Sequence, residues 1–182
     1  MKLFLFIISF SILKFCISGN TQGNKICWEE NQLLTWKDFR GNIPNVSDYG
    51  AKTYIVLRYE QITPNEISIT NCMLKNKSWV ASEEKSSVGI MHEQYHFNIA
   101  EIFARKIRQE LSTVVNPSIS QIKIIFDSWI EKYNSEQILY DSETFHCLNA
   151  LEQSKWQMKI DSQLIGLKQF RNEIVSLKNV SK

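Results

Sequence analysis

The sequence predicts an α+β domain, in which a small antiparallel sheet is followed by a long helix and then by a helical C-terminal half. Two observations predict this order. Residues 53–80 are rich in β-branched and aromatic side chains, whereas from Glu83 onward apolar residues recur at helical spacing. The chain has 182 residues, of which 43% are hydrophobic and 22% charged. This composition suits one folded core and excludes a largely disordered chain.

The N-terminus has the pattern of a secretory signal peptide. Lys2 precedes an apolar stretch over residues 3–13, which is shorter than the roughly 20 residues that a membrane span needs. We therefore predict that residues 1–18 are a cleaved signal peptide and that the protein is periplasmic or secreted, with no remaining membrane span. The bulky residues just before Cys16 argue against a lipid anchor on that cysteine. Residues 19–182 then form a single domain.

The charge balance argues against a nucleic-acid partner. The chain has 21 basic and 19 acidic residues. Lys2 and Lys14 lie in or beside the predicted apolar leader, which has no acidic residue, so its removal leaves 19 of each sign. A phosphate backbone requires a concentrated basic face, which this neutral composition does not indicate. The oligomeric state stays open.

Three cysteines remain after the predicted cleavage, namely Cys27, Cys72 and Cys147. Export permits disulfides, and an odd number allows at most one pair within a chain. The sequence does not select among the three pairings. No two cysteines have the C-x-x-C spacing, so neither a thiolate zinc knuckle nor a thioredoxin-like centre is expected.

Two strands and a short third one are expected before the helices. Residues 53–60 are β-branched and aromatic, and the turn-like Thr63-Pro64-Asn65 follows them. Residues 66–70 alternate apolar with polar side chains, as a half-buried strand does, and Trp79–Val80 can extend the sheet. An antiparallel sheet of two or three strands accounts for these segments.

Three helices are expected in the second half. Ser82 and the two glutamates after it predict a helix N-terminus, because carboxylates there interact favourably with the helix dipole. This helix continues to Leu111, and Asn116-Pro117 separates it from a second one. A third, long helix is expected to carry the apolar positions between residues 148 and 174. Such apolar stripes are typical of packing and say nothing about function.

One segment of the first helix carries chemistry. His92-Glu93-Gln94-Tyr95-His96 has the pattern H-E-x-x-H. His92 and His96 lie one turn apart on one face, so both imidazoles can bind a single cation at about 2.0 to 2.1 Å. Glu93 can approach a metal-bound water as general base. Because structural zinc sites are usually closed and rich in cysteine, the pattern favours an open, catalytic Zn²⁺ site.

A third metal ligand must come from another segment. Glu101 lies on a different side of the helix from His92 and His96. The candidates lie in residues 140–146, expected just before or within the third helix. His146 is favoured, because it is the only remaining histidine and would complete a His₃ set. Glu143 and Asp141 are the alternatives, Asp141 more as a partner that orients an imidazole.

Several segments together resemble a known family. They are residues 34–39, 77–80, 92–101 and 103–106, with further matches at Tyr140, Asp141, Thr144, His146, Gln153 and Trp156. These segments resemble a bacterial family of predicted secreted zinc-dependent proteases, formerly a domain of unknown function. The resemblance implies a zincin-like fold and peptide hydrolysis. Tyr95 and Cys147 stand where the family pattern has glycine, and both are expected to add bulk near the metal.

The leading hypothesis is an exported zinc-dependent metallopeptidase that acts on a peptide or protein. Glu93 would be its general base, and His92, His96 and His146 its zinc ligands. An edge strand within residues 66–80 is expected to bind the substrate backbone by strand addition. The alternative is an exported, zinc-stabilised binding module that does not catalyse, whose idle site Tyr95 and Cys147 would crowd. A metal-independent helical interaction domain is the third interpretation.

Overall fold

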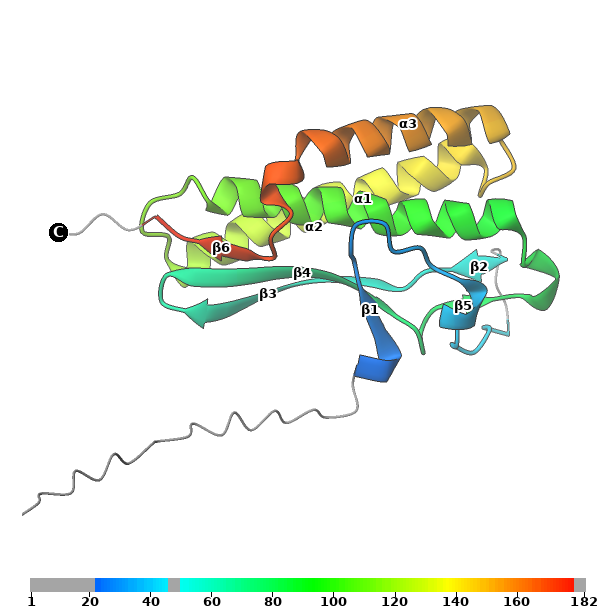
Figure 1. Ribbon diagram of the computed structural model, residues 1–182, viewed down its shortest axis with the longest axis horizontal. Coiled ribbons are helices and arrows are strands. Elements are labelled where there is room, and N and C mark those ends of the chain that lie inside the picture. The colour runs from blue at the N-terminus through cyan, green and yellow to red at the C-terminus, as the bar shows by residue number, and fades with distance from the viewer. Residues whose placement is uncertain (1–21, 46–49, 179–182) are drawn as a thin grey trace, which may run out of the picture.

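The computed structural model describes residues 22–45 and 50–178 (Figure 1). In chain order, the elements are β1 (Lys25–Cys27), β2 (Ala51–Lys52), β3 (Ile55–Thr63), β4 (Glu66–Leu74), β5 (Trp79–Val80), α1 (Ser87–Leu111), α2 (Ile119–Thr144), α3 (Ala150–Gly166) and β6 (Ile174–Ser176). The predicted class is confirmed, since a small antiparallel sheet is combined with three α-helices. The predicted signal peptide, Cys16 included, lies outside the described residues.

β4 is the central strand of the main sheet. It pairs antiparallel with β3 along one edge and with β1 and β6 along the other, and β2 pairs with β5 in a separate two-stranded sheet. The sheet is therefore larger than the two or three strands expected. The prediction of a free edge within residues 66–80 is wrong for β4, because both of its edges are already hydrogen-bonded. Among the described residues, β2 pairs on one side only.

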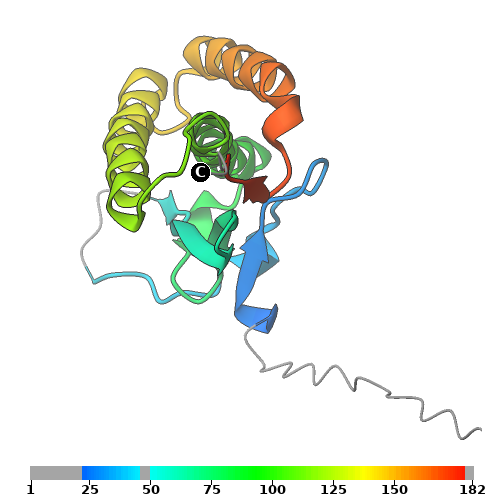
Figure 2. The same ribbon diagram turned by 90° about the vertical axis from the view of Figure 1, so that its left-hand side faces the viewer.

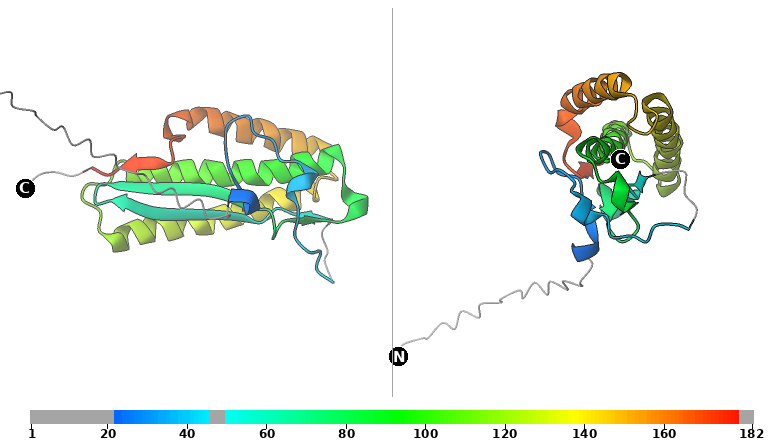
Figure 3. Two further views of the ribbon diagram at one scale, coloured as in Figure 1. Left: turned by 60° about the horizontal axis from the view of Figure 1, so that its bottom comes forward. Right: turned by 90° about the vertical axis from the view of Figure 1, so that its right-hand side faces the viewer.

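α1 is the central helix of the three. Seen along its axis from either end, it lies between the sheet on one side and α2 and α3 on the others (Figures 2 and 3). One apolar cluster joins the sheet, α1 and α2, and includes Ile69, Ile107 and Phe126. A second joins the three helices and includes Ile99 and Trp156. The helix with the H-E-x-x-H pattern is thus packed against the sheet, α2 and α3.

The helix boundaries differ from the predicted ones. Ser82–Glu84 is a separate 3-10 turn, and α1 begins at Ser87 because the Ser86 side chain accepts a hydrogen bond from the Gly89 amide at 2.9 Å. α2 continues to Thr144, so Asp141 and Glu143 lie in its last turns and not in the third helix. α3 is shorter than expected, and Ile174 lies in β6.

Three consecutive left-handed residues end α2. Phe145, His146 and Cys147 have φ angles of 48°, 50° and 72°. None of them is glycine, the residue that favours this conformation, and no proline follows, so the sequence has no ordinary stop signal here. The consequence is that His146 lies in the loop between α2 and α3 and not on a helix.

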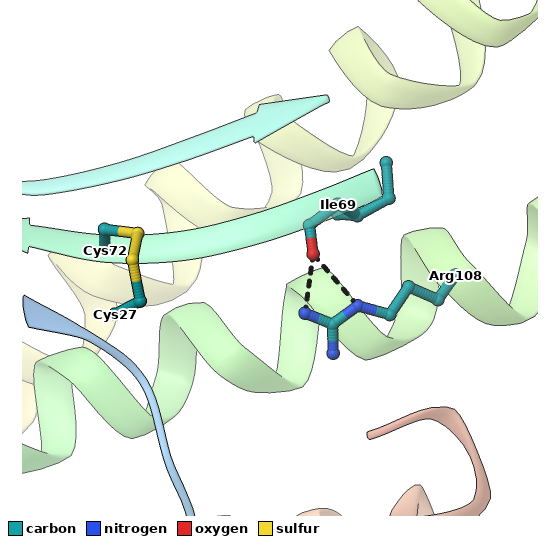
Figure 4. Close-up of a disulfide and its surroundings, with 4 residues drawn as sticks. All are labelled: Cys27, Ile69, Cys72 and Arg108. Atoms are coloured by element: carbon teal, nitrogen blue, oxygen red, sulfur yellow. Dashed lines mark hydrogen bonds between the residues drawn. A yellow bond between two sulfur atoms is a disulfide. The ribbon is translucent and has the colours of Figure 1, made fainter. Parts of the chain in front are cut away.

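A disulfide joins β1 to β4. Cys27 and Cys72 are paired partners in the antiparallel register and form the bond, which settles the choice among three pairings (Figure 4). Cys147 is a free, half-buried thiol. The bond fixes the N-terminal strand to the centre of the sheet.

Removing this bond is expected to destabilise the domain. The two cysteines are 45 residues apart, and closing a loop of that length lowers the chain entropy of the unfolded state enough to contribute about 4 kcal/mol. In a urea titration, the free energy of unfolding of the double variant Cys27→Ser with Cys72→Ser should be about 4 kcal/mol lower than that of the parent protein. Cys147→Ser is the control and should stay within about 1 kcal/mol of the parent. Equal stability of the double variant and the control would contradict the expectation.

A buried ion cluster ties α1 to its neighbours. The Arg108 guanidinium donates to the Ile69 carbonyl oxygen of β4 at 2.7 and 3.2 Å (Figure 4), to Glu101 at 2.8 Å and to the Phe170 carbonyl oxygen at 3.1 Å. Arg105 donates to the same Glu101 carboxylate at 3.0 Å. Glu101 is therefore used in packing, away from the two histidines, as its helical phase predicts.

Candidate metal centre

α1 brings His92 and His96 together on the face that meets α2. Their Nε2 atoms lie 3.1 Å apart, and both rings are largely buried. The local cause is the one-turn spacing, which the enclosing helices preserve. The predicted histidine pair is therefore close enough for both rings to bind one ion.

Asp141 lies between the two histidines. Its Oδ1 atom is 3.0 Å from His92 Nε2 and 2.8 Å from His96 Nε2. A tetrahedral ion with bonds of about 2.0 to 2.1 Å would have its ligand atoms about 3.3 Å apart. The three donor atoms are thus spaced much as such an ion requires. The sequence predicted Asp141 mainly as a residue that orients a histidine ligand. In the structure its carboxylate oxygen lies among the candidate donor atoms themselves.

Two glutamines fix the other side of each ring. The Gln153 side-chain oxygen lies 3.0 Å from His92 Nδ1, and the Gln137 side-chain oxygen contacts His96 Nδ1. Both amides are oriented by their NH₂ groups, because Gln137 donates to the His96 carbonyl oxygen at 2.9 Å and Gln153 donates to the Tyr140 hydroxyl. An amide oxygen accepts from Nδ1–H, so each Nε2 atom faces Asp141, with a lone pair when the ring is neutral and with an N–H when it is protonated.

This arrangement concentrates electron-rich atoms. Two Nε2 atoms and a carboxylate oxygen face one another within hydrogen-bonding distance. These electron-rich atoms repel one another unless a cation or an added proton lies between them, and either of these would stabilise the cluster. The donor set, two imidazoles and a carboxylate, suits a borderline divalent ion such as Zn²⁺.

Protonation of the cluster follows from the same contacts. Burial alone would raise the pKa of Asp141, but hydrogen bonds to His92 and His96 outweigh it and hold this pKa well below its usual range. Burial alone would lower the pKa of His96, whereas its hydrogen bond to Asp141 and the charge of Glu93 raise it. A proton on His96 competes with a metal ion, so metal affinity is expected to fall as the pH is lowered.

His146 is a fourth donor at the edge of the cluster. Its Nδ1 atom lies 3.3 Å from Asp141 Oδ1, and its side chain is 48% exposed. Ligand atoms of His92, Asp141 and His146 all lie within 4.8 Å of one another, so this group can hold a metal ion. The structure therefore brings all three histidines to one place.

Glu143 is not brought to this place. Its Oε2 atom accepts a hydrogen bond from the Trp156 indole at 2.7 Å, and it does not line the cleft beside the histidines. Asp141 lies two residues earlier, and two residues on a helix are about 200° apart, so Glu143 points away from the face that carries Asp141. Its observed role is to connect α2 with α3.

Glu93 lies in the same cleft without touching the histidine nitrogens. Its Oε2 atom accepts hydrogen bonds from the Thr53 backbone amide at 2.8 Å and from the Thr53 hydroxyl. Thr53 lies between β2 and β3, so the strands hold the carboxylate from the side opposite α2.

The two tyrosines near the motif are not in the cleft. Tyr140 is fully buried and stacks on the His92 ring, with centroids 4.6 Å apart. Tyr95 points to α3, where its hydroxyl donates to Asp161 at 3.0 Å; burial, and then Asp161, raise the pKa of Tyr95 to about 12. The expectation that Tyr95 crowds the metal is wrong, because it is one residue, and so about 100°, away from His96 on the helix. Cys147 does line the cleft.

The cleft has a volume of about 580 Å³. β2 and the residues up to Ile55 form one wall, α2 forms the other, and His92, Glu93 and His96 lie between them. The donor atoms therefore face a space large enough for several residues of a peptide.

Comparisons with protein-family models, with curated proteins and with solved structures find no match to this chain. In residues 22–45 and 50–178, no helix is long and apolar enough to cross a membrane.

Gln153 offers a test of how the cluster is held. Gln153→Ala removes the acceptor of His92 Nδ1–H and should weaken zinc affinity by about 10- to 100-fold in competition with a chromophoric chelator. Gln153→Glu keeps an acceptor and should retain most of the affinity. Gln157→Ala, on the same helix but outside the cleft, is the control. Unchanged affinity in a folded Gln153→Ala protein would show that the glutamine does not orient the ring.

Proposed function

We propose that the protein is an exported zinc-dependent metallopeptidase with a zincin-like fold. The observation that carries the proposal is the convergence of His92 Nε2, His96 Nε2 and Asp141 Oδ1 beside Glu93 in an open cleft. The sequence resemblance stated above agrees with it. His92, His96 and Asp141 would hold the zinc ion, with His146 beside them.

The residues of the cleft suit hydrolysis of an amide bond. A zinc ion bound here would supply Lewis acidity, which polarises a carbonyl and acidifies a bound water. Glu93, held in place by Thr53, would accept the proton from the attacking water and return it to the leaving amine. His146, which lines the cleft and is 48% exposed, would also meet the substrate.

A peptide can lie along the wall formed by β2. This strand pairs only with β5 among the described residues, and Ala51, Lys52 and Thr53 line the cleft. An extended segment added to the open side of β2 would satisfy main-chain hydrogen bonds and pass the metal centre. This replaces residues 66–80 as the proposed backbone-binding strand.

Metal removal tests the proposal directly. The purified mature protein should contain one zinc per chain by elemental mass spectrometry and should cleave members of a mixed peptide library. A strong chelator should abolish cleavage, and zinc added in slight excess should restore it. Cleavage that survives complete removal of the metal would contradict the proposal.

The binding module is the second candidate, and His146 is the observation that favours it. If His146 were a fourth protein ligand, the coordination sphere would be closed, as in structural zinc sites. In that case chelation should lower the melting temperature strongly, and no library peptide should be cleaved. Stability loss accompanied by zinc-dependent cleavage favours the peptidase instead.

A further inference from the structure

The cleft has two chemically different halves. α1 and α2 run antiparallel, so the residues that line the cleft fall in order along α1 (Figure 1). Beyond His92, toward the N-terminus of α1, the lining residues are Trp36, Gly50, Glu84, Ser86 and Gly89. Beyond His96, toward the middle of α2, they include Tyr133, Asn134 and Ile138. The metal donors lie between the two halves.

Glu84 gives the first half a free negative charge. In the part of the chain that the structure describes, its carboxylate has no hydrogen bond or ion pair. Its side chain packs over Gly50, where an added Cβ would come within 2.5 Å of Glu84 Cγ. The absence of a side chain at Gly50 therefore leaves room for Glu84 beside β2. Glu84 and Cys147, which lies in the loop between α2 and α3, both line the cleft.

An aromatic ring lies in the same half. The Trp36 indole nitrogen donates to the Ser86 carbonyl oxygen at 3.1 Å, which fixes the ring at the N-terminus of α1. A carboxylate together with an aromatic ring is a combination that attracts lysine and arginine side chains, through a charge-assisted hydrogen bond and a cation–π contact.

The second half has no charge. Tyr133 is half-buried, Ile138 is 70% exposed, and Ile55 closes the wall from the strand side. Exposed apolar side chains inside a cleft favour an apolar substrate residue. Among the lining residues that the structure describes, Lys52 on β2 is the one lysine or arginine.

We propose that the cleft selects peptides with a lysine or arginine on the Glu84 side of the scissile bond and an apolar residue on the Ile138 side. Glu84 is then a specificity-determining residue. This inference rests on the proposed peptidase function, and it adds the class of substrate to it.

The test compares cleavage of matched peptides that carry lysine, glutamine or glutamate at each position flanking the scissile bond. At the position on the Glu84 side of the scissile bond, the parent protein should cleave the lysine peptide with a kcat/KM about tenfold higher than that for the glutamate peptide. Glu84→Gln should reduce this preference to about threefold or less, and Glu84→Lys should reverse it. Glu83→Gln, the neighbouring exposed glutamate that does not line the cleft, is the control and should keep the parental preference.

A binding measurement provides a second readout. In a Glu93→Gln background, fluorescence anisotropy should show tighter binding of the lysine peptide than of the glutamate peptide, and adding Glu84→Lys should invert the order. Cleavage without any charge preference, or a preference that Glu84→Lys leaves intact, overturns the substrate class and leaves the peptidase proposal standing. Failure of the parent to cleave or bind any peptide overturns both.

Discussion

Glu93→Gln should leave one zinc per chain and lower kcat/KM for peptide hydrolysis by about 10²- to 10⁴-fold, the usual contribution of a general base. Glutamine has the size of glutamate, and its oxygen can still accept from the Thr53 amide and hydroxyl, so the strand contact is retained. It cannot accept a proton from water. Since Glu93 makes no hydrogen bond to His92 or His96, the metal donors should be undisturbed.

Elemental analysis and steady-state kinetics on the same preparation separate the two effects. Glu83→Gln is the matched control, because it removes an exposed carboxylate near the same end of α1 without altering the cleft. Parental cleavage by Glu93→Gln would show that another group takes the proton. Loss of zinc from this variant would show instead that the carboxylate acts as a ligand.

The sequence predicted those parts of the site that depend on local geometry. His92 and His96 are four residues apart on a continuous helix, and this spacing alone places both rings on one face. The change from strand-like to helical patterning likewise predicted the α+β class. Both predictions use short-range periodicity, which the three-dimensional packing leaves unchanged.

The positions of Asp141 and His146 in the site depend on where α2 ends. Apolar positions marked this helix only to about Tyr133, and neither glycine nor proline stands at residues 145–147. The helix in fact continues to Thr144, which carries Asp141 into the cluster and leaves His146 in a left-handed loop. Long-range packing decided this end, so the relative positions of Asp141 and His146 could not be predicted.

The two glutamines were missed for a different reason. A buried glutamine belongs to no recognisable sequence motif, and the sequence singles out Gln153 only through the resemblance to the family pattern. Gln137 does carry a weak signal, because it lies four residues before Asp141 and so on the same face of α2. The sequence could not show that this face meets the histidines.

The third ligand decides between an open and a closed metal site. Asp141→Asn should lower zinc affinity by more than about 100-fold, because even loss of a residue that merely orients a ligand costs about 10- to 100-fold. Asp141 Oδ1 contacts both Nε2 atoms, at 3.0 and 2.8 Å, and asparagine would bring no negative charge to them. The measurement is competition with a chromophoric chelator, with circular dichroism to check folding.

The zinc affinity of Asp141→Asn is to be compared with that of His146→Ala, which tests whether His146 is a fourth ligand. The His146 side chain is 48% exposed, and its Nδ1 atom lies 3.3 Å from Asp141 Oδ1 at the edge of the cluster. We therefore expect its removal to change zinc affinity by less than about tenfold while reducing hydrolysis. If His146→Ala loses zinc as completely as Asp141→Asn, four protein ligands enclose the ion and no position is left for water. The zinc-stabilised module would then explain the site better than the peptidase, because an open coordination position is what separates a catalytic zinc centre from a structural one.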